Sequence, residues 1–223
     1  MKKPLFSLFS AVAVAVLLSL GAGAHGLLAA EDETTSTQDP GPKNLATATF
    51  AGGCFWCVES DFDQIPGVVE TVSGYTGGTL ENPTYKKVGT GGTGHREAVK
   101  ITFDPNVVSY DALLSAFWRS IDPTDEGGQF CDRGETYTTA VFVHDQSQRA
   151  AAEASRAHAE EDLGQTIVTP IEDAAVFYDA EDYHQNYYKK NPVRYKFYRW
   201  NCGRNQQVES LWQDQAYAGI PTH

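Results

Sequence analysis

The sequence Gly52-Gly53-Cys54-Phe55-Trp56-Cys57 decides how this chain is interpreted, because a strand-like run precedes it and a helical pattern follows it. Residues 46–50 predict a strand, and the apolar residues of 55–65 recur at helical spacing. The paired glycines suit a tight turn between the two elements. Cys54 should therefore begin a helix, where free N–H groups and the helix dipole favour negative charge. We expect this position to lower the thiol pKa and make Cys54 a nucleophile.

Composition excludes several classes of partner. The chain has 223 residues and a formal net charge of −12, which argues against nucleic acid and anionic membrane surfaces as partners. The sole methionine is Met1, which suits a protein that works where methionine is oxidised. Beyond the N-terminal segment, roughly 180 residues remain, enough for one domain with a sizeable core.

The N-terminus resembles an export signal. Lys2 and Lys3 precede an apolar run, and small residues follow it at 21–24. This order predicts a signal peptide over residues 1–30, cleaved near residue 24 or 30, although an uncleaved anchor is the alternative. Residues 31–44 are acidic and interrupted by proline, so we expect a flexible linker. The chain should be exported, to the periplasm or outside the cell, and should not associate with a membrane after cleavage.

The remaining chain predicts one catalytic domain over residues 45–223. Strand patterns occupy 46–50, 68–73, 97–103 and 138–144, and helical patterns follow Cys54 and Ser109. A third helix should run from about Ser147 to Leu163, with Gly164 as its C-terminal cap. The order predicts an α+β fold, a two-layer split βαβ (ferredoxin-like) plait with a mostly antiparallel sheet and helices on one face. From about residue 192 the aromatic and basic residues show no clear period, so we predict an extended C-terminal tail.

The chain's four cysteines allow more than one interpretation. In an exported protein they would ordinarily form two structural disulfides. The C-x-x-C spacing of Cys54 and Cys57, however, is typical of redox-active pairs. A zinc site is disfavoured, because Cys131 and Cys202 are isolated rather than a second close pair.

Several segments carry a resemblance to one family. They are Gly-Cys-Phe-Trp at 53–56, Gly-Tyr-Thr-Gly-Gly at 74–78, Asn-Pro-Thr-Tyr at 82–85, Thr-Gly-His-Arg-Glu-Ala-Val at 93–99, Asp132 with Tyr137, and Glu-Asp-Tyr-His-Gln at 181–185. In this order they resemble peptide methionine sulfoxide reductases of the A type. The resemblance covers most of residues 45–192.

The resemblance implies thiol-dependent reduction of methionine S-sulfoxide, protein-bound or free, through a sulfenic acid on Cys54. Glu97 would donate a proton to the departing oxygen, which requires burial to raise its pKa. Tyr75 and Tyr137 would hydrogen-bond the sulfoxide oxygen, and Asp132 would order the site.

Two further roles follow from the resemblance. Phe55 and Trp56 would form an apolar pocket for the S-methyl group of the substrate. Cys202 and Cys57 are equal candidates for the thiol that resolves the sulfenic acid, and Cys131 is a weaker candidate. A thioredoxin-like donor would then reduce the resulting disulfide. We expect a monomer with no cofactor and no metal.

Two other functions are alternatives to methionine sulfoxide reduction. Cys54 and Cys57 suit a thioredoxin-like disulfide oxidoreductase, although a glycine-rich loop follows where that class has a proline-bearing strand. Alternatively, all four cysteines would be paired permanently in an exported binding module. A single reactive thiol at Cys54 would favour the reductase, and stable pairing of Cys54 would favour the binding module.

Overall fold

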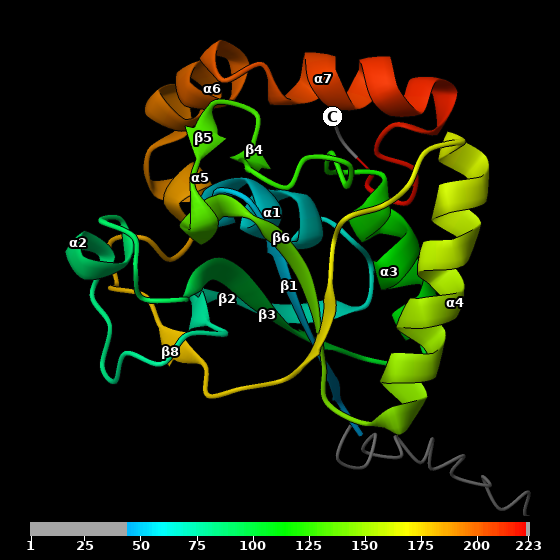
Figure 1. Ribbon diagram of the computed structural model, residues 1–223, viewed down its shortest axis with the longest axis horizontal. Coiled ribbons are helices and arrows are strands. Elements are labelled where there is room, and N and C mark those ends of the chain that lie inside the picture. The colour runs from blue at the N-terminus through cyan, green and yellow to red at the C-terminus, as the bar shows by residue number, and fades with distance from the viewer. Residues whose placement is uncertain (1–43, 222–223) are drawn as a thin grey trace, which may run out of the picture. The chain divides into compact units, whose positions relative to one another are not determined.

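The computed structural model describes residues 44–221, so the predicted signal peptide and the linker up to residue 43 lie outside the described part. The N-terminal half contains β1 (Ala46–Gly52), α1 (Phe55–Phe62), β2 (Val68–Thr76), α2 (Tyr85–Val88), β3 (Arg96–Phe103) and α3 (Tyr110–Trp118). The C-terminal half contains β4 (Gly128–Gln129), β5 (Asp132–Arg133), the 3₁₀ turn η1 (Glu135–Tyr137), β6 (Thr139–Val143), α4 (Gln146–Leu163), β7 (Ile171–Asp173), β8 (Tyr178–Asp179), α5 (Tyr187–Lys190), α6 (Pro192–Asn201), α7 (Arg204–Trp212) and η2 (Gln213–Gln215). Figure 1 shows the helices α6 and α7 above α1 in this view.

The main sheet has six strands in the order β7-β6-β1-β3-β2-β8. All neighbours pair antiparallel except β6 and β7, which are parallel. The four predicted strands form the centre of this sheet, and the prediction of a mostly antiparallel sheet in an α+β fold is confirmed. A separate hairpin, β4 with β5, stands apart from the main sheet and carries Asp132.

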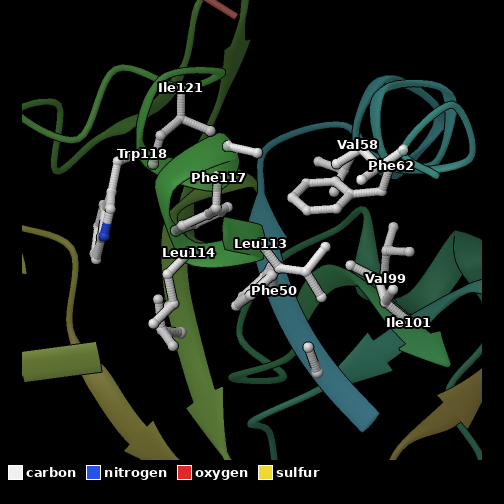
Figure 2. Close-up of a cluster of buried hydrophobic side chains, with 14 of the residues drawn as sticks. Phe50, Val58, Phe62, Val99, Ile101, Leu113, Leu114, Phe117, Trp118 and Ile121 are labelled. Carbon is white, nitrogen blue, oxygen red and sulfur yellow. The ribbon is translucent and has the colours of Figure 1, made fainter. Parts of the chain in front are cut away.

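Different segments pack against the two faces of the sheet. Side chains that alternate along the central strands, such as Phe50, Val99 and Ile101, join residues of α1, α3 and α4 in one large apolar cluster (Figure 2). The opposite face holds a smaller cluster around Phe142, covered by Phe177 from the segment before β8. Each fully buried Phe or Leu side chain contributes about 1.5–3 kcal/mol. The helices therefore bury one face of the sheet, as predicted.

The helix boundaries follow capping chemistry that the sequence displays. The Ser109 hydroxyl accepts a hydrogen bond from the backbone N–H of Ala112, 3.1 Å away, and so caps α3. Asp145 caps α4 in the same way, so α4 begins at Gln146, one residue before the predicted start at Ser147. Gly164 ends α4 in the left-handed conformation at φ 65°, as predicted for a C-terminal cap. Within residues 44–221, no helix is long and apolar enough to cross a membrane.

The prediction of an extended C-terminal tail is wrong. Residues from Pro192 onward form two helices, α6 and α7, and Pro192 occupies the first turn, where its missing N–H costs nothing. The apolar period is interrupted because an arginine shares the buried face with Tyr195 in α6 and with Val208 and Trp212 in α7. Arg199 and Arg204 are buried, whereas Trp200 is 65% exposed. Amphipathic periodicity assumes the opposite distribution.

Candidate active site

The turn that precedes α1 places Cys54 at the beginning of the helix, as predicted. Gly53 has φ 82°, a conformation that side chains rarely adopt, and a Cβ atom there would lie 2.6 Å from Cβ of Gln129. Only glycine therefore fits this turn. Cys54 occupies the N-cap position of α1, and its carbonyl accepts the backbone N–H of Cys57 at 3.1 Å. Both cysteines are free and buried.

The order of the two thiol pKa values is the reverse of the prediction, because Cys57 rather than Cys54 has the lowered pKa. Burial, followed by a hydrogen bond with Cys57, raises the pKa of Cys54 well above its usual value. The same hydrogen bond lowers the pKa of Cys57 to about 7, with the positive charges of Arg199 and Arg204 adding to the effect. The expectation of a lowered Cys54 pKa is wrong, because desolvation of a buried thiolate outweighs the field of one helix terminus. The first negative charge of the pair lies on Cys57.

Glu97 lies beside this helix terminus on the neighbouring strand β3. Its Oε2 accepts the backbone N–H of Phe55 at 3.0 Å, and the side chain is 2% exposed. Burial raises the pKa of Glu97 to about 8, although the hydrogen bond from Phe55 opposes the shift. The carboxyl group is therefore protonated at neutral pH, as proton donation requires.

The tyrosine pair near Glu97 is Tyr137 with Tyr85 rather than with Tyr75. Tyr137 interacts with both Glu97 and Tyr85 through hydrogen bonds. Burial raises the pKa of Tyr85 to about 12, and the charges of Glu97 and Cys54 add to it. Burial also raises the pKa of Tyr137. Both hydroxyls thus stay protonated and can donate hydrogen bonds.

Tyr75 occupies a different position from the one that the resemblance implied. It pairs with Glu97 across the strands, but its hydroxyl donates to Glu181 at 2.9 Å. Glu181 also accepts the backbone N–H of Tyr85 at 2.9 Å. Tyr75 therefore fixes the residue that positions α2. Tyr85 was missed as a functional residue, although it ends the Asn-Pro-Thr-Tyr segment.

Asp132 lies on β5 and is held by the C-terminal helices. Its carboxylate accepts the hydroxyl of Tyr198 from α6. Burial raises the pKa of Asp132, while the Tyr198 hydrogen bond and Arg204 oppose the shift. Its charge acts in turn on Cys54 and on Glu97. Asp132 therefore lies near enough to Cys54 and Glu97 for its charge to act on both.

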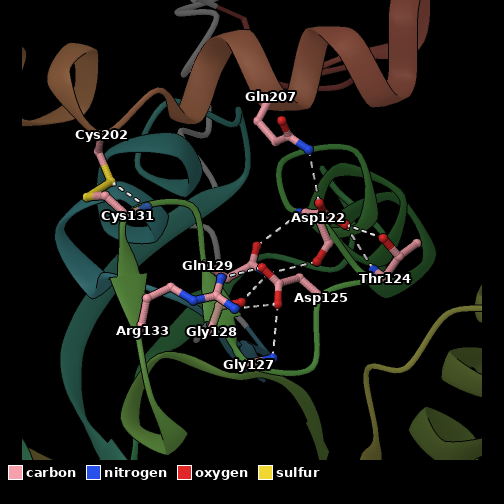
Figure 3. Close-up of polar contacts among 10 residues, drawn as sticks. All are labelled: Asp122, Thr124, Asp125, Gly127, Gly128, Gln129, Cys131, Arg133, Cys202 and Gln207. Atoms are coloured by element: carbon pink, nitrogen blue, oxygen red, sulfur yellow. Dashed lines mark hydrogen bonds and ion pairs between the residues drawn. A yellow bond between two sulfur atoms is a disulfide. The ribbon is translucent and has the colours of Figure 1, made fainter.

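The two remaining cysteines form a disulfide next to Asp132. Cys131 and Cys202 are bonded across a sequence separation of 71 residues, and the Cys202 sulfur lies 3.8 Å from Oδ2 of Asp132. Figure 3 shows this bond joining the hairpin of Gly128 and Arg133 to the helical segment above it. A depression of about 330 Å³ opens beside Cys202. Cys131 itself is exposed, so the disulfide is accessible from outside.

An aromatic group surrounds the start of α1. Phe55 is 1% exposed and stacks with Tyr85 at 6.5 Å between ring centroids. Trp56 stacks flat on Tyr187 at 3.7 Å, and its Nε1 donates to Nδ1 of His184 at 3.0 Å. Burial lowers the pKa of His184 to about 4, so this ring is neutral. Phe55 and Trp56 therefore belong to an apolar, uncharged aromatic group at the start of α1.

Two buried arginines of the C-terminal helices also lie near the site, and no pattern in the sequence indicated them. Arg199 forms an ion pair with Asp61 of α1 at 2.7 Å. Arg204 is 2% exposed and donates to the carbonyl oxygens of Gly52 at 3.0 Å and Ser120 at 2.9 Å. Both were assigned to the extended tail.

Within residues 44–221, the single cluster of three potential metal ligands consists of Cys131, Asp132 and Cys202. Two of these three ligand atoms are joined in the disulfide, so the cluster offers one free ligand.

Comparison with known proteins agrees with this chemistry. A family profile described as peptide methionine sulfoxide reductase matches residues 46–216. The protein called peptide methionine sulfoxide reductase MsrA 2 of Rhizobium meliloti is 57% identical over 173 residues, which cover 78% of this chain and 86% of that protein. The MsrA of Bacillus subtilis is 53% identical over 167 residues, which cover 74% and 94%.

Solved structures are also similar. Mxr1 of Saccharomyces cerevisiae in its reduced form aligns with a TM-score of 0.65 and 31% identity, covering 68% of this chain and 88% of that chain. Methionine sulfoxide reductase A of Corynebacterium diphtheriae aligns with a TM-score of 0.61 and 33% identity, covering 69% and 78%.

Proposed function

The chain belongs to the peptide methionine sulfoxide reductase family, and on this premise we propose that Cys54 reduces the S epimer of methionine sulfoxide to methionine. The enzyme is an oxidoreductase that works through thiol chemistry. One observation carries the assignment of the site: the Cys54 thiol and the protonated Glu97 carboxyl meet at the same helix terminus. A nucleophile and a proton donor are the two groups that sulfoxide reduction needs.

In the first step the Cys54 sulfur attacks the sulfoxide sulfur. Glu97 donates its proton to the sulfoxide oxygen, and the hydroxyls of Tyr85 and Tyr137 hydrogen-bond that oxygen as negative charge develops on it. The Cys54 proton passes to Cys57, whose lower pKa makes it the acceptor within the pair. Oxygen transfer leaves methionine and a sulfenic acid on Cys54.

Phe55 and Trp56 hold the methyl group of the substrate. Aromatic rings attract the polarisable sulfur and exclude water from the reacting atoms. The neutral His184 behind Trp56 keeps this aromatic group uncharged. Asp132 orders the opposite side of the site through Tyr198.

The sulfenic acid is resolved by Cys57. Cys57 is the other free cysteine of the described residues, and it is hydrogen-bonded to Cys54. Cys202 and Cys131 are bonded to each other, so neither offers a free thiol in this state. They remain the alternative, since Cys202 lies beside Asp132 and their pair would become a dithiol on reduction.

A thioredoxin-like dithiol donor reduces the resulting disulfide and returns the enzyme to its starting state. A disulfide oxidoreductase acting on protein disulfides fits the site less well. The buried, protonated Glu97 carboxyl group at the same helix terminus can protonate a departing oxygen, which exchange between two disulfides does not require.

To test this function, one equivalent of a methyl sulfoxide substrate is added to the fully reduced protein without a dithiol donor. We expect one equivalent of methionine and, by mass spectrometry of peptides, a new Cys54–Cys57 disulfide. Cys54→Ser should form no methionine. Turnover by Cys54→Ser would refute the assignment, and a disulfide from Cys54 to Cys202 or Cys131 would replace Cys57 as the resolving thiol.

We further propose that the enzyme is exported and acts in the periplasm or outside the cell as a monomer. The exposed Cys131–Cys202 disulfide supports this location, because such bonds persist in oxidising compartments. The mass of the N-terminal peptide from fractionated cells tests the proposal. A chain that still begins at residue 1, in a reducing compartment, would contradict it.

We also propose that the core of the fold is a ferredoxin-like plait. The order β6-β1-β3-β2, antiparallel throughout, supports a split βαβ plait. The strands β7 and β8 then extend that core at its two edges.

A further inference from the structure

Cys57 and Asp61 lie on one face of α1. They are four residues apart, so their side chains are neighbours one turn from each other. Arg199 of α6 lies against this face, with its NH1 2.7 Å from Oδ1 of Asp61 and its NH2 3.3 Å from Oδ2. Cys57 is therefore close to a buried guanidinium group on the side of α6.

Arg204 of α7 approaches the same helix from the opposite end. Its NH1 donates to the carbonyl oxygen of Gly52, and a Cβ atom built on Gly53 would lie 3.8 Å from this NH1. The guanidinium group is thus within one turn of the thiol pair. Arg204 thus contacts the chain before Cys57 and Arg199 contacts it after Cys57, and the charges of both act on the Cys57 thiol.

Arg204 has an unusual set of partners. Its two NH groups bond to carbonyl oxygens, it forms no ion pair within residues 44–221, and its buried Nε has no hydrogen-bond partner. A fully buried cation is costly unless an anion is close. Asp61 forms its ion pair with Arg199, so an anion close to Arg204 would complete the arrangement.

We propose that Arg199 and Arg204 are positioning residues that hold Cys57 as a thiolate and so make it the thiol that resolves the Cys54 sulfenic acid. This inference rests on the proposed function. Arg204 supplies the unpaired charge, and the charge of Arg199 is shared with Asp61. The C-terminal helices therefore act on the reaction through Cys57, without touching the substrate.

The positive charges assist the formation of the Cys54–Cys57 disulfide. The Cys57 thiolate attacks the sulfur of the Cys54 sulfenic acid, the S–S bond forms and the S–O bond breaks. The proton that Cys57 took up in the first step passes to the Glu97 carboxylate or to solvent, which leaves the attacking thiolate. The same proton then reaches the hydroxide that departs with the electron pair of the S–O bond, and water forms. Cys57 is oxidised, and Cys54 passes from sulfenic acid to disulfide.

Other titratable groups also face Cys57, and the experiment must separate them from the arginines. They are Cys54 and Asp61 on α1, Tyr195 and Tyr198 on α6, and Glu97 on β3. Asp61 has the opposite charge to the arginines, and its effect on the thiolate is opposite in sign. If the substitutions only damaged the packing, the shifts in the Cys57 pKa would not have opposite signs for Asp61 and Arg204.

The experiment uses the Cys54→Ser protein with its Cys131–Cys202 disulfide intact, in which Cys57 is the one free thiol of the four cysteines. The rate of iodoacetamide alkylation at Cys57 is followed against pH by mass spectrometry. Arg204→Gln should move the midpoint up by about one pH unit or more. Asp61→Asn should move it down, and Arg204→Lys should restore most of the original midpoint.

The matched control is Arg194→Gln, an exposed arginine on α6, which should leave the midpoint in place. Equal midpoints in all variants, or shifts of the same sign in Arg204→Gln and Asp61→Asn, would overturn the proposal. Should Arg204→Gln fail to fold, Asp61→Asn and Arg204→Lys still decide the question by their signs.

A second readout uses all four cysteines and one equivalent of substrate. In Arg204→Gln we expect disulfide formation to slow more than methionine release, so that a sulfenic acid accumulates and is trapped by dimedone. Sulfenic acid that disappears at the same rate with and without Arg204 would refute the inference alone. A failure to form either methionine or sulfenic acid with the parent protein would refute the proposed function instead.

Discussion

Replacing Glu97 with glutamine should stabilise the protein while it abolishes proton donation. Glutamine keeps the shape of the side chain and an oxygen for the Phe55 N–H, 3.0 Å away, but it cannot ionise. In the folded protein the pKa of Glu97 is about 8, because burial disfavours the carboxylate, against an ordinary value of 4.5. The wild-type carboxyl group must therefore be destabilising at any pH where it would ionise in the unfolded chain.

The magnitude follows from these two values. The folded pKa lies above the unfolded one, so the unfolded chain releases this proton first. The free energy of unfolding should fall as pH rises from about 4.5 and level off above about 8. At about 1.4 kcal/mol for each pH unit, the whole difference corresponds to about 5 kcal/mol. The advantage of Glu97→Gln should grow from about 1 kcal/mol near pH 5 to about 3 kcal/mol near pH 7 and about 5 kcal/mol near pH 9.

The assay is urea unfolding of wild type and Glu97→Gln, followed by tryptophan fluorescence over this pH range. Glu209→Gln is the matched control, because Glu209 is exposed on α7 and the substitution is the same. In single-turnover experiments, Glu97→Gln should reduce methionine at least about a hundredfold more slowly than wild type.

Two results would refute this reasoning separately. A stability difference that stays constant with pH would show that Glu97 is ionised in the folded protein at neutral pH. An unchanged single-turnover rate would show that another group protonates the sulfoxide oxygen.

The remaining predictions concern the tyrosines and the disulfide. Tyr137→Phe and Tyr85→Phe should each lower kcat/KM about a hundredfold with little change in stability, as for loss of one donor to a developing oxyanion. Tyr75→Phe should instead lower stability by about 1–3 kcal/mol, measured by urea unfolding, since it removes the donor to Glu181; a larger effect on kcat/KM than that of Tyr85→Phe would reverse these roles. Cys202→Ser should lower stability by about 2–4 kcal/mol by opening the Cys131–Cys202 loop, yet still form the Cys54–Cys57 disulfide with one equivalent of substrate; absence of that disulfide would favour Cys202 as the resolving thiol.

Local sequence patterns predicted most of the framework. The four central strands are β-branched or alternating, and Ser109 and Gly164 mark helix ends with interactions that reach only a few residues along the chain. The Gly52-Gly53 turn was readable for the same reason, since a positive φ at Gly53 restricts the residue type directly. Features whose cause is local are visible in the sequence.

Features caused by distant contacts were not visible. The pKa of Cys54 depends on burial, which other segments produce, so the helix terminus alone gave the wrong direction. Tyr75 and Tyr85 are both tyrosines in segments that resemble the family, and only the three-dimensional arrangement shows which hydroxyl is already bonded to Glu181. The helices α6 and α7 were missed because Arg199 and Arg204 face inward, where a pattern search expects apolar residues.

The contact of Arg204 with Gly52 joins positions 152 residues apart. The cysteine turn therefore precedes the arginines that act on its charge by most of the folded domain. A polypeptide cut before α6 contains both thiols without these two positive charges. The charge of the thiol pair is set only when the C-terminal helices have packed onto α1.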